Sequence, residues 1–144
     1  MSFPAPLPGL VVRYAFLWRR EAKAGAQEAR KERPAAIVIV SRKVPDGPAR
    51  VVVVPVTHSP PRDPALAVEL PDAVARSLGL DDGPHWVVCD EVNRFAWPGF
   101  DLRPIPGRSG AWEYGMLPEA IYDEVLRRII ALNEARRVSV TDRD

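Results

Sequence analysis

The chain has 144 residues, of which 47% are hydrophobic and 27% are charged, and its formal net charge at pH 7 is +1. This length suits one domain with a buried core, and the composition is ordinary for a soluble globular protein. One cysteine excludes an internal disulfide, and neither it nor the two histidines stand at a metal-ligand spacing, so we expect no metal site and no other cofactor. Because no apolar run could span a membrane and the N-terminus lacks a secretory pattern, we expect a cytoplasmic protein without a membrane partner.

The charges are unevenly distributed along the chain. Residues 1–50 contain ten Lys and Arg against four Asp and Glu, whereas residues 51–144 contain ten against fifteen. A basic segment on an otherwise acidic body is typical of a face that binds a polyanion. A solvated basic loop without any partner would give the same distribution.

The first half of the chain predicts three strands and a long connection. LVVRYAFLW at residues 10–18 indicates the first strand. Residues 19–33 are charged and have no clear apolar period, so they are expected to form a long, mobile connection with at most a helical turn. Strands at residues 34–44 and 50–57 flank the turn sequence PDGP, and we expect them to pair as an antiparallel hairpin.

The second of these hairpin strands has an unusual composition. Four consecutive valines at residues 51–54 indicate burial on both faces, because β-branched side chains pack well on a pleated surface. Pro55 follows and has no N–H to donate to a neighbouring strand. Thr57 and His58 then place a hydroxyl and an imidazole at the end of this apolar strand.

The second half of the chain predicts two strands and two helices. Residues 65–70 indicate a short strand, residues 71–83 a short helix, and residues 86–95 a fourth substantial strand. Residues 117–137 carry apolar side chains at three- to four-residue spacing and indicate an amphipathic helix. We expect residues 138–144 to form a flexible tail.

Strands first and helices late indicate an α+β fold around a small β-barrel. In this arrangement one short helix follows the third or fourth strand, and the amphipathic helix lies near the C-terminus. Residues 1–137 are expected to form one domain.

The predicted hairpin brings together residues that are far apart in the sequence. In an antiparallel pair the start of one strand lies beside the end of the next, so Arg33 should lie next to Thr57 and His58. A guanidinium, a hydroxyl and an imidazole together suit RNA cleavage in which the 2′-hydroxyl attacks its own phosphate. Each residue also has an ordinary interpretation: Arg33 could pair with Glu32 or Asp90, Thr57 could bond to a turn, and His58 could be solvated.

The segments RPAAIVIV, VVVVPVTHSP and HWVVCDEVNRFAWPGFDLRP, in this order, resemble the MazF/PemK family of mRNA endoribonuclease toxins. The resemblance implies an SH3-like β-barrel, a homodimer, a cognate antitoxin, and metal-independent cleavage of single-stranded RNA to 2′,3′-cyclic phosphate and 5′-OH ends. It also implies that Arg33 and Thr57 are catalytic. His58 belongs to the THSPP variant of the motif, so its catalytic role rests on the chemistry of imidazole.

Cationic, hydrogen-bonding and aromatic side chains are candidates to bind the RNA. The aromatic side chain among them could instead fill the barrel or a dimer interface, and the arginines could form surface ion pairs. The candidates are Arg19, Arg20, Lys23, Arg30, Lys31, Asn93, Arg94, Trp97 and Arg103. His85 is interpreted as a loop residue and Cys89 as a small buried residue.

Two other functions fit the same fold. One is a toxin that inhibits a protein target, as the related CcdB family does with DNA gyrase, and it predicts that Arg33 and Thr57 are dispensable. The other is a catalytically silent relative that keeps the basic face and binds nucleic acid without cleaving it. Binding that weakens steeply with salt, without cleavage, would indicate the silent relative.

Overall fold

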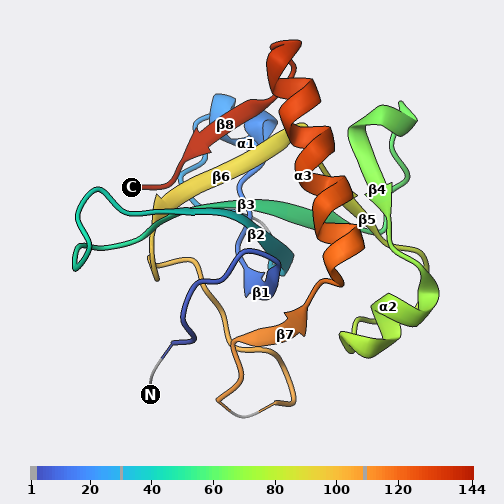
Figure 1. The fold of residues 1–144 in the computed structure, drawn as a ribbon, viewed down its shortest axis with the longest axis horizontal. Helices are drawn as coiled ribbons and strands as arrows, with labels where there is room; N and C mark the ends of the chain where they lie inside the picture. The colour runs from blue at the N-terminus through green and yellow to red at the C-terminus, as the bar shows by residue number, and fades with distance from the viewer. Residues whose placement is uncertain (1–2, 30, 109) are drawn as a thin grey trace.

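The computed structural model describes residues 3–29, 31–108 and 110–144. It is a mixed α+β fold, as predicted, in which a curved sheet of eight strands is covered by three helices (Figure 1). The elements in chain order are β1 (Leu10–Tyr14), α1 (Arg19–Lys23), β2 (Arg33–Ser41), β3 (Arg50–Thr57), a 3-10 turn (Pro64–Leu66), β4 (Ala67–Glu69), α2 (Asp72–Ser77), β5 (Trp86–Val88), β6 (Glu91–Ala96), β7 (Glu113–Met116), α3 (Glu119–Glu134) and β8 (Ser139–Asp142).

The strand order is β4-β5-β3-β2-β1-β7, and β6 pairs with both β3 and β8. All pairs are antiparallel except the parallel pair of β6 and β8. Within the described residues the end strands β4 and β7 do not pair with each other, so the small barrel is open. None of the helices described is long and apolar enough to cross a membrane.

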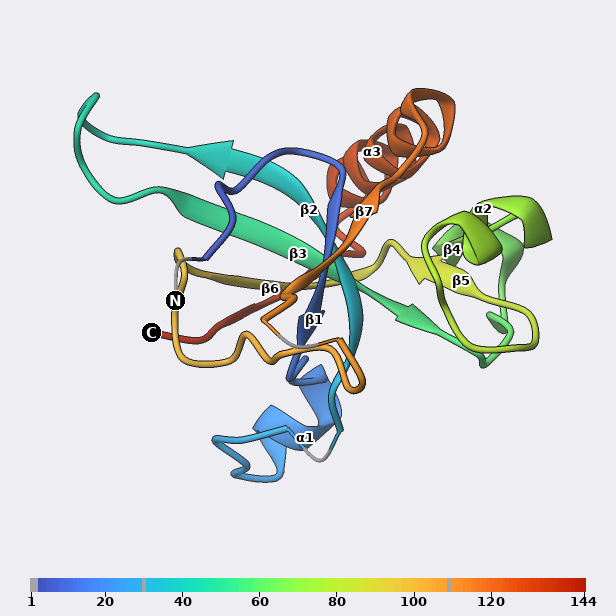
Figure 2. The ribbon, with the colours of Figure 1, turned by 90° about the horizontal axis from the view of Figure 1, so that it is seen from below.

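The β2–β3 hairpin is confirmed and forms the centre of the sheet. Ala35 lies opposite Pro55 and Ser41 opposite Arg50, with a register shift between Ile37 and Ile39. Figure 2 shows β3 running across the molecule, from the projecting tip of the hairpin to the part formed by β4, β5 and α2. The two ends of β3 therefore lie in different surroundings, and its C-terminal end reaches the α2 side.

Both faces of β3 are buried, as its valines indicate. Val51 and Val53 point to one apolar cluster, which also contains Tyr14, Phe16 and Phe95. Val54 and Val56 alternate with them and point to a second cluster beneath α3. Successive side chains on a strand point to opposite faces, so this strand contributes to two cores at once. Burying a valine side chain stabilises a fold by about 1.5 kcal/mol or more, and this packing fixes the path of β3.

Helix α3 covers the second of these clusters. Its buried stripe consists of Val125, Ile129 and Leu132, at the spacing of one helix face. The hydroxyl of Tyr122 donates a hydrogen bond of 2.7 Å to the carbonyl of Val38 on β2. The predicted helix is therefore confirmed, with ends two to three residues inside the expected range.

The strand predicted for residues 86–95 is two strands. Strand β5 pairs with the end of β3 through Val87 and Val56, and β6 pairs with its start through Asn93 and Val53. Five residues lie between Val87 and Asn93, but only two lie between their partners Val53 and Val56. The segment between β5 and β6 is therefore too long to stay paired with β3 and leaves the sheet there. Pro55, which cannot donate a backbone hydrogen bond, lies in this gap.

The chain ends in a strand rather than in the expected flexible tail. Residues Ser139–Asp142 form β8 along β6. The guanidinium of Arg143 is only 4% exposed, forms an ion pair of 2.9 Å with Asp101, and donates a hydrogen bond of 2.7 Å to the carbonyl of Ala15. These contacts hold the C-terminus against the first cluster of the core.

Candidate active site

An open cleft of about 980 Å³ lies where β2 begins and β3 ends. Arg33, Thr57 and His58 all line it, so the fold brings together the three residues that we predicted to be catalytic. Its other walls come from the segment before α1, the loop after β3 and the loop between α2 and β5. The cleft is thus formed around the fixed C-terminal end of a buried strand.

Arg33 is the cation on one wall of the cleft. Its guanidinium lies 5.1 Å from the ring centroid of Trp18, an aromatic residue that the sequence analysis did not select. Burial lowers the pKa of Arg33 from its ordinary value, partly offset by attraction to Glu21. The Nε of Arg33 is buried and has no hydrogen-bond partner among the described residues. Because Arg33 lines the cleft as a partly desolvated cation, its guanidinium is suited to bind an anion there.

The two carboxylates that we considered as ordinary partners of Arg33 do not form ion pairs with it. Glu32 instead pairs with Arg13 at 3.1 Å and with Arg103 at 3.5 Å. Asp90 lines the same cleft, but neither it nor any other carboxylate of the described chain forms an ion pair with Arg33. The charge of Arg33 is therefore left for a ligand in the cleft.

Thr57 is half-buried at the last position of β3. Its Oγ1 accepts a hydrogen bond of 3.1 Å from the backbone N–H of Ser59, in the local turn that we considered as its ordinary role. This bond uses only an acceptor position, because a hydroxyl also carries one donor. The O–H of Thr57 remains able to donate to a bound oxygen.

His58 is held by both of its ring nitrogens. Its Nδ1–H donates to the carbonyl of Pro84 at 2.8 Å, and its Nε2–H donates to Oδ1 of Asp81 at 3.0 Å. These two hydrogen bonds, first from Pro84 and then from Asp81, raise the pKa of His58 above its ordinary value. The ring is 49% exposed, so it is accessible from the cleft while its orientation is fixed.

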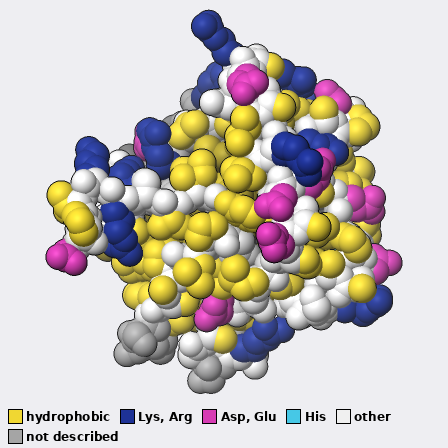
Figure 3. Space-filling view, viewed as in Figure 1, with side chains coloured by type: hydrophobic (Ala, Val, Ile, Leu, Met, Phe, Trp, Pro, Cys, Tyr) yellow, Lys and Arg dark blue, Asp and Glu magenta, His cyan; other side chains and the backbone are white. Residues whose placement is uncertain are grey.

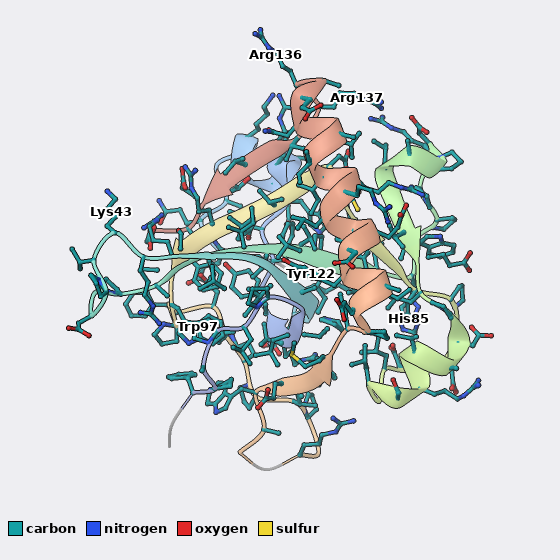
Figure 4. All side chains as sticks on the ribbon, in the orientation of Figure 1. Lys43, His85, Trp97, Tyr122, Arg136 and Arg137 are labelled. Atoms are coloured by element: carbon teal, nitrogen blue, oxygen red, sulfur yellow. The ribbon has the colours of Figure 1, made fainter. Side chains whose placement is uncertain are left out.

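Asp81 and His85 complete this part of the site, and the sequence analysis missed both. The buried ring of His85, which we had interpreted as a loop residue, donates from Nε2 to the same Oδ1 of Asp81 at 3.1 Å. Partial burial acts to raise the pKa of Asp81, but the hydrogen bonds from His85 and His58 hold it below its ordinary value. The sequence DDGPH places Asp81 and His85 four residues apart, but only the fold reveals their contact with His58 (Figure 4 labels His85).

Two of the predicted RNA contacts line the cleft. The guanidinium of Arg20 lies 5.5 Å from the centroid of the Trp18 ring, and Lys31 lies near enough to His58 to act on its charge. With Arg33 they are three of the five described Lys and Arg residues that line the cleft, which also has five carboxylates in its walls. Arg30 lies outside the described residues.

Arg19 and Lys23 line a different depression. It is formed between α1 and β8, and it also contains Arg136 and Arg137 from the end of α3 (Figure 4). The short helix α1 directs Arg20 toward the cleft and these two residues away from it. The basic N-terminal segment therefore serves two separate surfaces.

Asn93 is a structural residue and not an RNA contact. Its side chain is fully buried, its Oδ1 accepts a hydrogen bond from the backbone N–H of Leu17 at 2.9 Å, and its Nδ2 donates to the carbonyl of Leu17 at 2.8 Å. Its side chain joins β6 to the segment after β1. Asn93 therefore shapes the wall of the barrel and is unavailable to a ligand.

Three further candidates also lie outside the cleft lining and have other partners. Arg94 forms the surface ion pair that we considered as its alternative, at 2.7 Å from Asp142. The indole of Trp97 is half-buried, donates to the carbonyl of Pro4 at 3.1 Å, and lies across the molecule from His85 in Figure 4. Arg103 is shared between Glu32 and nearby backbone carbonyls.

Cys89 is buried, as predicted, and burial raises the pKa of its thiol to about 12. Its thiol donates to the carbonyl of Val87 at 3.5 Å. A protonated, inaccessible thiol cannot act as a nucleophile.

A comparison with known families places most of the chain in one family. The family model described as "PemK-like, MazF-like toxin of type II toxin-antitoxin system" matches residues 16–132. No curated protein matches the chain. The matched segment begins just before Trp18 and ends within α3, so it contains every residue of the cleft discussed above.

Proposed function

Because the chain belongs to the PemK-like, MazF-like toxins of type II toxin-antitoxin systems, we propose that it cleaves single-stranded RNA as an endoribonuclease. A toxin of such a system has a cognate antitoxin protein as its partner. The observation that carries the proposal is the cleft itself, in which Arg33 has no carboxylate partner among the described residues and faces the same space as Thr57 and His58. The RNA supplies its own nucleophile, so the reaction requires no metal-bound water.

Each of the three residues has a separate task in this reaction. As the 2′-oxygen bonds to phosphorus and the bond to the 5′-oxygen breaks, the 2′-hydroxyl passes its proton to water in the open cleft, and negative charge grows on the non-bridging oxygens. The guanidinium of Arg33 neutralises that charge, and the free O–H of Thr57 donates a hydrogen bond to one of these oxygens. Both groups are positioned before the RNA binds, since β2, which carries Arg33, and β3, which carries Thr57, pack into both apolar clusters.

His58 provides the proton for the leaving 5′-oxygen. Its Nδ1–H is held by the Pro84 carbonyl, so Nε2 is the nitrogen that exchanges its proton with a substrate. In the resting site Nε2–H donates to Asp81, and this contact, after the bond to Pro84, raises the pKa of His58 and so favours its charged form. His58 therefore enters the reaction as an acid.

Arg20 and Lys31 extend the positive wall of the cleft and are proposed to bind neighbouring phosphates. Trp18 lies between Arg20 and Arg33 and offers an aromatic ring near the scissile phosphate, although both guanidinium groups already contact it. These residues recognise the RNA backbone. They give the cleft affinity for an extended single strand.

The homodimer implied by the family resemblance is also part of this proposal. Hydrophobic side chains spread over much of the face seen in Figure 3, interrupted by acidic and basic side chains to the right of its centre. The exposed hydrophobic residues of the chain include Ile39, Met116 and Ile130, which are about half exposed. Light scattering on the purified protein would give twice the monomer mass of 16.0 kDa if this dimer forms.

The direct test is to incubate the purified protein with a mixed-sequence single-stranded RNA in EDTA and to map the product ends. We expect cleavage at a few sites with 2′,3′-cyclic phosphate and 5′-OH ends, and no cleavage by Arg33→Ala. Intact RNA in the presence of folded protein would contradict the proposal. It would favour a toxin that inhibits a protein target, or a silent relative if the RNA is bound.

A further inference from the structure

The only two histidines of the chain meet at one carboxylate. His58 follows β3 and His85 precedes β5, yet their ring centroids are 4.4 Å apart. Nε2 of each ring lies within 3.1 Å of Oδ1 of Asp81. All three possible ligand atoms lie within 4.8 Å of one another. Two loops that are unrelated in sequence thus place two imidazole nitrogens and one carboxylate oxygen around a common point.

We propose that His58, Asp81 and His85 form a binding site for a divalent cation of the zinc class. In a tetrahedral zinc site with bonds of about 2.0–2.1 Å, neighbouring ligand atoms are about 3.3 Å apart. The two nitrogen–oxygen distances here are 3.0 Å and 3.1 Å, so small side-chain shifts would admit the ion. Two imidazoles and one carboxylate favour Zn²⁺ over Mg²⁺ or Ca²⁺, which prefer sites made of oxygen ligands.

The surroundings of the three ligands support this assignment. The Nδ1–H of His58 donates to the Pro84 carbonyl, which leaves Nε2 to face the ion, as is usual for histidines that bind metals. The ring of His85 is 3% exposed and fixed, whereas the carboxylate of Asp81 is 78% exposed. The ion can therefore enter from solvent, and water can supply the fourth ligand, as in sites that keep an open position.

One of the two histidines lacks a hydrogen-bond partner for its other ring nitrogen, and this lowers the zinc affinity that we expect. Nδ1 of His85 is buried and has no hydrogen-bond partner among the described residues. When Nε2 binds the ion, the proton of His85 must lie on this nitrogen, where it has no acceptor. The missing acceptor for this N–H should weaken zinc binding by about 10- to 100-fold relative to a site in which both histidines have one. We therefore expect zinc to bind reversibly, and we expect the protein to fold without it.

Occupation of this site has a consequence that rests on the proposed function. The ion would bind Nε2 of His58, which is the nitrogen proposed to give its proton to the leaving oxygen. It would therefore block that proton transfer while leaving Arg33 and Thr57 in place. Zinc should inhibit RNA cleavage, and EDTA should restore it.

Binding is tested first, independently of any activity. ZnCl₂ is titrated into EDTA-treated, dialysed protein and followed by calorimetry and by the ring signals of the two histidines in NMR. We expect one zinc per chain and shifts of both rings, with no effect of MgCl₂. Asp81→Ala should lower the affinity at least 10-fold, whereas the matched variant of its neighbour, Asp82→Ala, should not. We use variants of the exposed Asp81 because His85→Ala removes a buried side chain and could destabilise the fold.

The outcomes separate this proposal from the proposed function. Absence of zinc binding, or equal binding by Asp81→Ala and by the unmodified protein, would overturn the metal site even if RNA is cleaved in EDTA. Binding that shifts both rings in a protein that leaves RNA intact would establish the metal site and contradict the RNase. If the protein both binds zinc and cleaves RNA, zinc should inhibit the native protein but not Asp81→Ala. The rate of each protein is compared with its own rate in EDTA.

Discussion

Nε2 of His58 lies 3.0 Å from Oδ1 of Asp81, although the two residues are 23 positions apart in the sequence. This contact joins the end of β3 to the loop that follows α2. Together with the bond to the Pro84 carbonyl, it raises the pKa of the imidazole in the cleft, because a carboxylate stabilises a protonated ring. The first prediction concerns this pair.

In metal-free protein, Asp81→Asn should lower the pKa of His58, since the variant removes the charge that stabilises the imidazolium. The backbone bond to Pro84, which is the largest cause of the raised pKa, remains. NMR titration of the two histidine rings measures this directly, and His58→Gln assigns the signals. An unchanged His58 pKa in Asp81→Asn would show that the contact does not form in solution.

The same pair predicts how the stability difference between the native protein and Asp81→Asn depends on pH. The pKa of His58 is raised, so its contribution is present below its ordinary value of about 6.5 and is lost as pH rises through the folded value. The pKa of Asp81 is lowered, so its contribution is lost as pH falls through the folded value. Urea unfolding should therefore show the largest difference between about pH 4 and 6.5.

Arg33 is predicted to act on the reaction rather than on folding. Arg33→Ala should lower the cleavage rate by about 10²-fold or more, as expected for loss of a group that stabilises transition-state charge. It should cost about 1 kcal/mol of stability or less, because the cation–π contact with Trp18 is the main interaction lost. Arg33→Lys keeps the charge without the bidentate geometry and should recover only part of the rate. Equal rates for Arg33→Ala and the native protein would contradict this role.

Thr57 allows a test of one hydroxyl with two nearly isosteric variants. Thr57→Val keeps the shape and removes both the donor to the substrate and the acceptor for the Ser59 N–H, which should cost about 1 kcal/mol of stability and most of the activity. Thr57→Ser retains the hydroxyl and should keep most of the cleavage rate. Cleavage rates normalised to the folded fraction distinguish the two roles. If Val and Ser variants cleave equally well, the hydroxyl does not contribute.

The C-terminal strand is predicted to be part of the stable fold. Arg143→Ala would leave Asp101 without its partner at a site where the guanidinium is 4% exposed, and loss of one member of a buried pair costs about 3 kcal/mol. Arg127→Ala, on the exposed face of α3, is the matched control and should change the free energy of unfolding by less than about 1 kcal/mol. Similar effects of the two variants in urea unfolding would show that β8 is dispensable.

The part of the site that could be predicted from sequence is the part that depends on one hairpin. The valines of residues 51–54 and the turn PDGP determine β2, β3 and their pairing, which places Arg33, Thr57 and His58 at one end. Local pattern and strand pairing were sufficient there. Nothing beyond the neighbouring strand was needed.

The remaining features depend on contacts between distant segments. Asp81 and His85 meet His58 only because β5 pairs with the last two residues of β3. Asn93 was selected as a polar residue at a strand end, but the chain after β1 covers it and uses its whole amide. The final strand β8 is four residues long and polar enough to resemble a tail, and it forms because β6 offers a free edge.

The central claim is that the RNA cleaves itself through its own 2′-hydroxyl within this cleft. Once a cleaved bond has been mapped, the most direct measurement uses two oligonucleotides in EDTA, one with a 2′-deoxyribose on the 5′ side of that bond and one with the same change one nucleotide further along. We predict that the first resists cleavage at this bond and that the second is still cleaved. Cleavage of both at the same rate would show that water, and not the 2′-hydroxyl, is the nucleophile, and would contradict the account.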